Sequence, residues 1–247
     1  MDTRGREFLK DGVRKSVDFS RTPQARGIEP PPPQKPPRPV ERIIALSPPG
    51  AWRTVPKLGL EEAIARRRSR RDFLAQPLSM EELSFLLWAT QGLRPGSPPG
   101  GNFRTVPSAG CRHALESYVA ALRVAGLAPA IYRYLPLDHA LVEAVRPADL
   151  AERLVRATFG QRFCGEGAAT FAWTAVPARM EWRYASASYK VIALDAGHVC
   201  QNLYLAGESI GTGVCAVAAY EQDLMDELLG VDGEEEFTLY LAAVGKR

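Results

Sequence analysis

The sequence predicts an α+β domain preceded by an extended, proline-rich arm. The chain has 247 residues, enough for one large domain with its own hydrophobic core. Segments with helical and with strand periodicity follow one another irregularly, without the repeated strand–helix–strand order of a doubly wound parallel sheet. Of the 20 prolines, 11 lie within residues 1–60. We therefore expect an arm over residues 1–55 and a folded domain over residues 56–247.

Composition and charge exclude several classes of protein. The net charge of +3 is small for a protein that grips nucleic acid over a broad face. Apolar runs stop short of the roughly 20 residues that span a bilayer, and the charged residues 1–7 are unlike a secretory signal. The four cysteines lie far apart, with no histidine at metal-ligand spacing, so we predict no metal site. We expect a soluble, cytoplasmic protein.

The arm is densest in proline between residues 30 and 39. Proline fixes φ and removes hydrogen-bond donors, so this segment is expected to be extended polyproline II. One interpretation is a ligand for the aromatic groove of a partner domain. The other is an arm that lies along its own domain or a neighbouring subunit, which we favour because matches to short motifs are common.

The pattern of apolar residues defines the elements of the folded domain, which begins near Pro56. Ser79 and Glu82 form a capping box, which starts a helix that Gly92 closes. A helix over residues 189–210 is apolar on more than one face, so we expect it to be central and buried. The other predicted elements are helices over 59–68 and 148–159, a loop over 94–101, and strands over 116–124, 130–135, 214–219 and 237–244.

A basic cluster over residues 66–73 is the first segment that could carry chemistry. Five arginines and a serine within six residues offer bidentate donors that suit a phosphate monoester. Arg67, Ser69 and Arg71 alternate along the chain, so an extended backbone would turn all three side chains to one side. A solvated charge run or a nuclear-localisation-like patch is an equally good interpretation of this segment alone.

Three further segments are candidates for a binding site. The Pro-Ser-Ala-Gly sequence at 107–110 predicts a turn whose backbone N–H groups can approach a ligand, with an ordinary loop as the alternative. Residues 211–220 are glycine-rich and then small and apolar, which suits either the floor under a flat aromatic ring or a buried strand. Residues 245–247 place two cations at the end of the chain, where a frayed terminus is the alternative.

Taken together, these segments resemble the nitroreductase family of FMN enzymes. The resemblance rests on the Arg-x-Ser-x-Arg-x-Phe motif at 67–73, the turn at 107–110, residues 194–203, and the late glycine-rich strand with its Gly-Lys end. The four segments occur in the family's order and cover the chain from about residue 60 to its C-terminus. Within the family, the chain is most similar to the SagB-type dehydrogenases, which include the azoline oxidases of peptide natural-product pathways.

The resemblance implies a homodimer with a central, mainly antiparallel sheet flanked by helices, and with FMN sites that two chains share. It places Arg67 and Ser69 at the FMN phosphate and Arg71 at the N1/O2 edge of the ring. A cation at that edge stabilises the negative charge of reduced flavin and raises its redox potential. The other residues that it implies in flavin binding are Pro107, Ser108, Ala109 and Gly110 from the other subunit, Val217, Ala218 and Ala219 against the isoalloxazine, and Lys246 and Arg247 at the phosphate.

Two residues are candidates for a catalytic role beside the flavin. Azoline oxidases have a Lys-Tyr pair upstream of the Asp-x-Gly-His helix, and this chain has Arg183 and Tyr184 there. Arg183 cannot release its proton near neutral pH, whereas Tyr184 can donate or accept one. The substitution weakens the case for azoline oxidation and leaves flavin binding untouched.

The function that the resemblance implies is an FMN-dependent oxidoreductase with a ping-pong cycle. Hydride would pass through flavin N5 from NAD(P)H or from a bound organic substrate, which is a small molecule or a peptide. The sequence has no G-x-G-x-x-G segment, so the donor would stack directly on the flavin. Two alternatives stay open: a non-catalytic flavin-binding partner in a peptide-modifying complex, and an azoline oxidase. We expect neither a nucleic acid nor a membrane among the partners.

Overall fold

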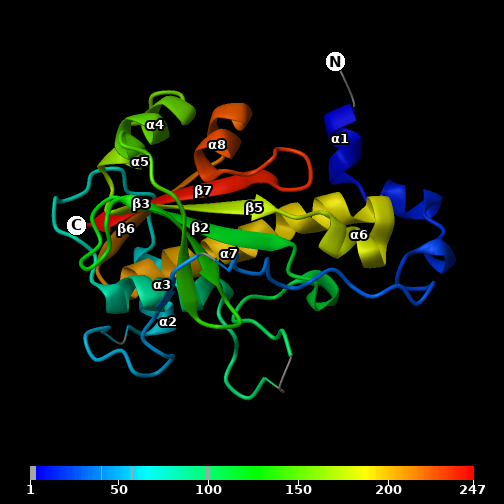
Figure 1. Ribbon diagram of the computed structural model, residues 1–247, viewed down its shortest axis with the longest axis horizontal. Coiled ribbons are helices and arrows are strands. Elements are labelled where there is room, and N and C mark those ends of the chain that lie inside the picture. The colour runs from blue at the N-terminus through cyan, green and yellow to red at the C-terminus, as the bar shows by residue number, and fades with distance from the viewer. Residues whose placement is uncertain (1–3, 40, 57, 98–100) are drawn as a thin grey trace.

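The centre of the computed structural model is an antiparallel sheet. The structure describes residues 4–39, 41–56, 58–97 and 101–247. Among them, seven strands pair in the order β1-β4-β3-β2-β5-β7-β6, and each pair of neighbours is antiparallel (Figure 1). This arrangement confirms the predicted α+β class and the mainly antiparallel sheet.

The helices and strands have the following bounds. The strands are Ile43–Ala45 (β1), Leu115–Ala121 (β2), Ala130–Leu135 (β3), Ala140–Val145 (β4), Ala169–Ala175 (β5), Thr212–Val217 (β6) and Phe237–Lys246 (β7). The α-helices are Arg4–Leu9 (α1), Leu60–Arg66 (α2), Met80–Gln91 (α3), Leu150–Ala157 (α4), Phe163–Glu166 (α5), Ala178–Tyr184 (α6), Tyr189–Ser209 (α7) and Gln222–Leu229 (α8). Short 3-10 turns are Gly12–Ser16 (η1), Phe19–Arg21 (η2), Ala109–Cys111 (η3) and Ala185–Ser188 (η4).

The two faces of the sheet carry separate hydrophobic clusters, because successive side chains of a strand point to opposite faces. On β5, Phe171 and Trp173 belong to the larger cluster, whereas Ala172 belongs to the smaller one. Helices α3 and α7 cover the larger cluster, and α4, α5 and α8 lie on the other face (Figure 1). The sheet is therefore the middle layer of three.

Local sequence signals predicted several of these elements correctly. Ser79 Oγ accepts a hydrogen bond from Glu82 N at 3.2 Å, and the Glu82 carboxylate accepts one from Ser79 N at 2.9 Å, so the capping box of α3 is confirmed. Gly92 caps the other end of α3. Strand β3 and helix α7 match their predicted bounds within one residue. The predicted loop over 94–101 includes residues 98–100, which lie outside the described residues.

The sequence analysis did not find several elements, of which β5 is the most central. Strand β5 has the sequence Ala-Thr-Phe-Ala-Trp-Thr-Ala and pairs with both β2 and β7. Alanine has a low strand propensity, and a strand buried on both faces lacks the polar alternation that identifies a surface strand. The other elements that it did not predict are β1, β4, α1, α5, α6 and α8.

The region before residue 56 is not uniformly extended. It contains α1, two 3-10 turns and β1, which pairs with β4 at one edge of the sheet. Residues 30–39 contain no helix or strand among those described and lie along their own domain, where Gln34 is buried. The division of the chain near residue 55 stays a prediction. None of the helices in the described ranges is both long and apolar enough to cross a membrane.

Candidate functional site

The basic cluster lies where the C-terminal part of α7 meets β6. Ser69 forms an isolated parallel bridge with Val214, and Arg70 N donates to Val214 O at 3.0 Å. Ser69 Oγ lies 2.9 Å from Tyr204 OH, and the Arg67 guanidinium lies 5.1 Å from the centre of the Tyr204 ring. The structure therefore brings Arg67 and Ser69 together against α7.

Two glycines allow the segment 70–73 to lie close to the sheet. A Cβ atom at Gly213 would lie 2.8 Å from Arg70 Cβ, and one at Gly245 would lie 2.6 Å from Phe73 Cγ. Real Cβ atoms do not approach other carbons this closely, so a larger residue at either position would displace the segment. Glycine at these two positions thus leaves room for the segment that carries the basic cluster to pack against the sheet.

Arg71 lies apart from Arg67 and Ser69. Its guanidinium is 5.7 Å from the centre of the Phe163 ring on α5. Phe163 belongs to the smaller hydrophobic cluster, whereas Tyr204 belongs to the larger one on the opposite face. The expectation that the three side chains share one side is therefore wrong, because only Ser69 bridges to β6 and the segment is not a continuous strand.

Ion pairs fix the two cations at the C-terminal end. Lys246 Nζ contacts the Glu82 carboxylate, and Arg247 Nη2 lies 2.9 Å from Glu208 Oε2. Arg70 Nε lies 3.9 Å from the other oxygen of the buried Glu208 carboxylate. Together with Arg67, this end of the sheet therefore carries four basic side chains, of which Lys246, Arg247 and Arg70 face the carboxylates of Glu82 and Glu208. Guanidinium and ammonium groups are the donors that bind phosphate in proteins.

Tyr204 is a site residue that the sequence analysis missed. Its hydroxyl lies against Ser69 Oγ and also accepts a hydrogen bond from Ala216 N at 2.8 Å. It therefore joins α7, β6 and the basic cluster at one atom. The signal that could have identified it is a tyrosine between two leucines of a helix expected to be buried, since a buried tyrosine hydroxyl needs a partner.

The glycine-rich strand continues past β6 on the side of the smaller cluster. Val217 is buried in that cluster, whereas Ala218 and Ala219 are exposed. Gln161 Nε2 donates to Ala219 O at 2.9 Å, which holds the exposed pair beside the loop between α4 and α5. The placement against a flavin ring that the resemblance implies for these three residues stays a prediction.

The turn at 107–110 lies against the predicted catalytic pair. Gly110 has φ 58°, and a Cβ atom there would lie 2.7 Å from Tyr184 OH and 2.8 Å from Arg183 Cδ. The Arg183 guanidinium lies 5.6 Å from the centre of the Tyr184 ring. Only glycine allows this approach with this backbone conformation. The structure thus brings together two groups of residues that are more than 70 positions apart in the sequence.

Asp195 on α7 lies beside this turn, where the Ser108 side chain and Ala109 N are the polar groups next to its carboxylate. Its Oδ2 atom is buried and has no hydrogen-bond partner among the described residues. Burial raises the pKa of the Asp195 carboxyl above its usual value, and the neighbouring Ser108 and Ala109 groups only partly oppose the shift. Ser108 Oγ accepts a hydrogen bond from His113 N at 2.9 Å. The turn is therefore held by a residue that follows it and lies against α7.

His113 is a structural histidine and is neutral at physiological pH. Its exposed fraction is 4%, and burial together with the nearby Arg104 guanidinium lowers its pKa to about 3. Its Nε2 lies 3.5 Å from Cys111 Sγ. Both residues line a cavity of about 340 Å³ that also includes Pro107 and Ser108. His113 therefore shapes the turn and is too weak a base for proton transfer near neutral pH.

The two halves of the candidate site lie at different ends of α7. Asp195 lies beside the turn in the first half of the helix, and Tyr204 contacts the basic cluster in the second half. Nine residues of helix separate them, a rise of roughly 13 Å. Figure 1 shows α6, which carries Arg183 and Tyr184, at one end of the molecule and the C-terminus at the opposite end. Among the described residues, the cavity that includes Pro107 and Ser108 is lined by neither Arg67 nor Ser69.

Comparisons with known proteins identify the class of this protein. The profile of the Nitroreductase family matches residues 64–246. A protein of Methanocaldococcus jannaschii designated a nitroreductase is 30% identical over 193 residues, which cover 78% of this chain and 93% of that protein. The chain therefore belongs to the nitroreductase family, whose members are typically flavin-dependent oxidoreductases, and it is an oxidoreductase.

Two crystal structures of proteins designated nitroreductases share the fold. The protein from Ralstonia eutropha has a TM-score of 0.68 and 29% identity, and the match covers 88% of this chain and 97% of that one. The protein from Anabaena variabilis has a TM-score of 0.69 and 24% identity, and the match covers 84% of this chain. This chain spans 42% of the length of the Anabaena protein.

Proposed function

We propose that the protein is an FMN-dependent oxidoreductase whose flavin sites are each completed by two copies of the chain. The observation that carries this proposal is the separation of the two halves of the site along α7. The half with Arg67 and Ser69 suits a phosphate, and the half with the turn at 107–110 and Tyr184 offers small residues and a proton donor. We expect a flavin to need both halves.

The charge of the half that contains Arg67 and Ser69 supports binding of a mononucleotide. Arg67 is a half-buried residue that forms no ion pair with any described residue, and its guanidinium lies over the ring of Tyr204, whose hydroxyl contacts Ser69. A free guanidinium and a hydroxyl are the donors that a terminal phosphate needs. Lys246 and Arg247 would either keep their ion pairs with Glu82 and Glu208 or contact the phosphate instead. These features favour FMN, because FAD has no terminal phosphate.

Exposed apolar residues on α2 and α7 support binding of a second copy of the chain. Leu194 on α7 is 54% exposed, and Leu60 on α2 is 66% exposed. A Cβ atom at Gly197, one turn after Leu194, would meet no described atom within 4 Å, so another helix can approach α7 there. Two copies related by a twofold axis across α7 would place the turn of one chain near Arg67 of the other.

The residues of the chain would divide the chemistry among them. FMN, when bound, supplies a two-electron carrier that accepts hydride from NAD(P)H or from an organic substrate and passes the electrons on. Arg67 and Ser69 would hold the phosphate, and Arg71 would favour the reduced state through its charge. Tyr184 would donate or accept the proton that accompanies electron transfer, while Arg183 stays charged and orients an anionic group.

The cofactor can be identified directly. Protein purified with excess FMN and FAD is denatured, and the released flavin is separated by chromatography. We expect FMN at one equivalent per chain. Released FAD, or no flavin after incubation with FMN, would contradict the proposal. Anaerobic bleaching of the yellow protein by NADH or NADPH would then exclude a non-catalytic flavin-binding role, and bleaching by an azoline-containing peptide instead would favour an azoline oxidase.

The shared site predicts that dimerisation and flavin binding are lost together. Light scattering should give twice the 27.0 kDa mass of one chain. The Leu194→Lys variant should be monomeric and bind FMN at least about tenfold more weakly, since a buried lysine in an interface is costly. The matched control is Ile43→Lys, which alters a 55% exposed residue on β1 at the far edge of the sheet. A monomeric Leu194→Lys protein with unchanged FMN affinity would refute the shared site.

A further inference from the structure

Buried arginines bind the backbone of the proline-rich segment. Arg104 Nη2 donates to Pro33 O at 2.7 Å. Arg133 donates from Nη1 to Lys35 O and from Nη2 to Pro36 O, the latter at 3.2 Å. The carbonyls of Lys35 and Pro36 each precede a proline, whose nitrogen carries no hydrogen, so a guanidinium with several donors is a suitable partner for them. These hydrogen bonds hold the backbone of residues 33–36 against Arg104 and Arg133.

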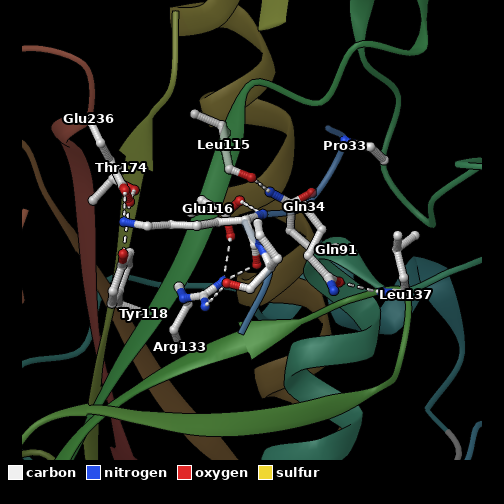
Figure 2. A network of polar contacts seen from close by, with 12 residues as sticks. Pro33, Gln34, Gln91, Leu115, Glu116, Tyr118, Arg133, Leu137, Thr174 and Glu236 are labelled. Carbon is white, nitrogen blue, oxygen red and sulfur yellow. Dashed lines mark hydrogen bonds and ion pairs between the residues drawn. The ribbon is translucent and has the colours of Figure 1, made fainter. Parts of the chain in front are cut away.

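Glu116 joins this segment to the candidate site. Its Oε1 accepts from Lys35 N at 2.7 Å and also from an Arg179 guanidinium N–H. Its Oε2 lies 3.8 Å from Arg133, and all three charged side chains are at most 5% exposed. Arg179 belongs to α6 and donates to His113 O at 3.4 Å. Figure 2 shows Glu116 and Arg133 on neighbouring strands, both directed at the segment that contains Gln34.

Trp182 is a second link between the arm and α6. Its Nε1 donates to Ile28 O at 2.7 Å, and its backbone carbonyl accepts from Gln24 N at 3.0 Å. The Trp182 ring also contacts the Arg112 guanidinium, which lies 4.8 Å from the ring centre. Arg112 directly follows the 3-10 turn η3. Trp182 immediately precedes Arg183 and Tyr184. The arm thus holds the helix that carries the predicted catalytic pair.

Side chains of the arm itself fix its register. Gln34 Nε2 donates to Asp138 Oδ2, and Gln34 Oε1 accepts from Leu137 N, both at 2.8 Å. Lys35 Nζ lies 2.7 Å from Glu236 Oε2. Gln34 is buried, whereas the Lys35 side chain is half-exposed. A buried amide with both ends bonded permits one register of the arm only.

We propose that residues 24–36 are a positioning strap for the reaction. The hydrogen bond from Lys35 N–H to Glu116 couples docking of the strap to Arg179 and thereby to the placement of Arg183 and Tyr184. This inference rests on the proposed function. It assigns a role in the reaction to residues that are not among the proposed flavin contacts. Within the described ranges, no hydrogen bond or ion pair joins the strap to the basic cluster at residues 67–71, so loss of the strap should slow hydride transfer without changing the redox potential of the flavin.

Two substitutions at one position isolate the decisive hydrogen bond. Lys35→Ala removes the ion pair with Glu236 and keeps the backbone N–H, whereas Lys35→Pro removes both. Pro36 already restricts residue 35 to extended conformations, which include the one that proline adopts. Loss of a hydrogen bond to a buried charged acceptor should weaken docking about tenfold or more. Lys35→Ala should weaken docking less than Lys35→Pro, because the buried Glu236 carboxylate keeps its hydrogen bonds from the Tyr118 and Thr174 hydroxyls.

Full-length, FMN-loaded protein is used for both measurements. Hydrogen exchange of the amides in residues 24–36 and 178–184 reports docking of the strap and order of α6. Stopped-flow reduction by NADH reports the limiting rate constant and the half-saturating concentration. We expect Lys35→Pro to accelerate exchange in both segments and to lower the limiting rate about tenfold, with an unchanged midpoint potential. Trp182→Phe, which keeps the ring and loses the bond to Ile28, should slow reduction in the same way.

The double variant Lys35→Pro with Trp182→Phe should be no slower than the slower single variant, because both substitutions break one coupling. Multiplied effects would overturn the proposal. Faster exchange of the strap with wild-type reduction kinetics, or a shifted midpoint potential, would also overturn it. Exchange of residues 178–184 does not require flavin. If the wild type binds no FMN, the proposed function fails, while unchanged exchange of α6 in Lys35→Pro would separately refute the strap.

Discussion

Replacing His113 with asparagine should make the stability of the protein less sensitive to acid. His113 lies directly after the turn, is buried, and has Arg104, Arg112 and Arg179 among its surroundings. These cations and the burial disfavour a protonated imidazole in the folded protein. Asparagine suits the backbone of this position, whose φ is 48°, and it has no proton to gain. The substitution therefore removes a titration while leaving the turn conformation accessible.

The size of the effect follows from the two pKa values. The pKa is about 3 in the folded protein and 6.5 in the unfolded chain. Below pH 6.5 the unfolded chain binds a proton that the folded protein refuses, so the free energy of unfolding falls as the pH falls from 6.5 towards 3. One pKa unit corresponds to about 1.4 kcal/mol. Between pH 8 and pH 5 the wild type should lose about 2 kcal/mol through this residue.

Urea denaturation at pH 8 and at pH 5 measures the effect. Burial also lowers the pKa of His139, but that residue is present in both proteins, so the difference between their pH dependences isolates His113. We expect the His113→Asn variant to lose about 2 kcal/mol less than the wild type over this range. Equal losses in the two proteins would show that His113 is protonated in the folded state and would refute the account of its surroundings.

Two further predictions concern the site. Arg71→Ala should lower the midpoint potential of bound FMN by about 30–65 mV, because a charge-assisted hydrogen bond of about 1.5–3 kcal/mol would be lost only in the reduced state. Arg67→Ala should weaken oxidised and reduced FMN alike, and a larger potential shift in Arg67→Ala than in Arg71→Ala would reverse their roles. Ala185→Gly should raise the free energy of unfolding by about 1 kcal/mol in urea melts, because Ala185 has φ 47° and ψ −136°, a region that only glycine adopts without strain. Decreased stability would show that the alanine side chain contributes packing.

Local signals in the sequence were sufficient for some elements. The capping box of α3 needs only Ser79 and Glu82, three positions apart, and both of its hydrogen bonds are present. Helix α7 and strand β3 were predicted because their apolar residues repeat at the period of the element itself. The motifs at 67–73 and 107–110 also identified the family. All of these signals lie within one helix, one strand or one turn.

Tertiary structure decided the parts that depend on distant residues. Alanine-rich β5 is a strand because β2 and β7 supply its hydrogen-bond partners on both sides. The side chain of Arg71 points away from that of Ser69. The reason is that the described segment forms a single bridge with β6, at Ser69, and that the Arg71 guanidinium packs against the Phe163 ring on α5. Glu116 contacts Lys35 and Arg179, which lie 81 and 63 positions away. Such contacts have no period or spacing along the chain, because they exist only after hydrophobic burial has brought the elements together.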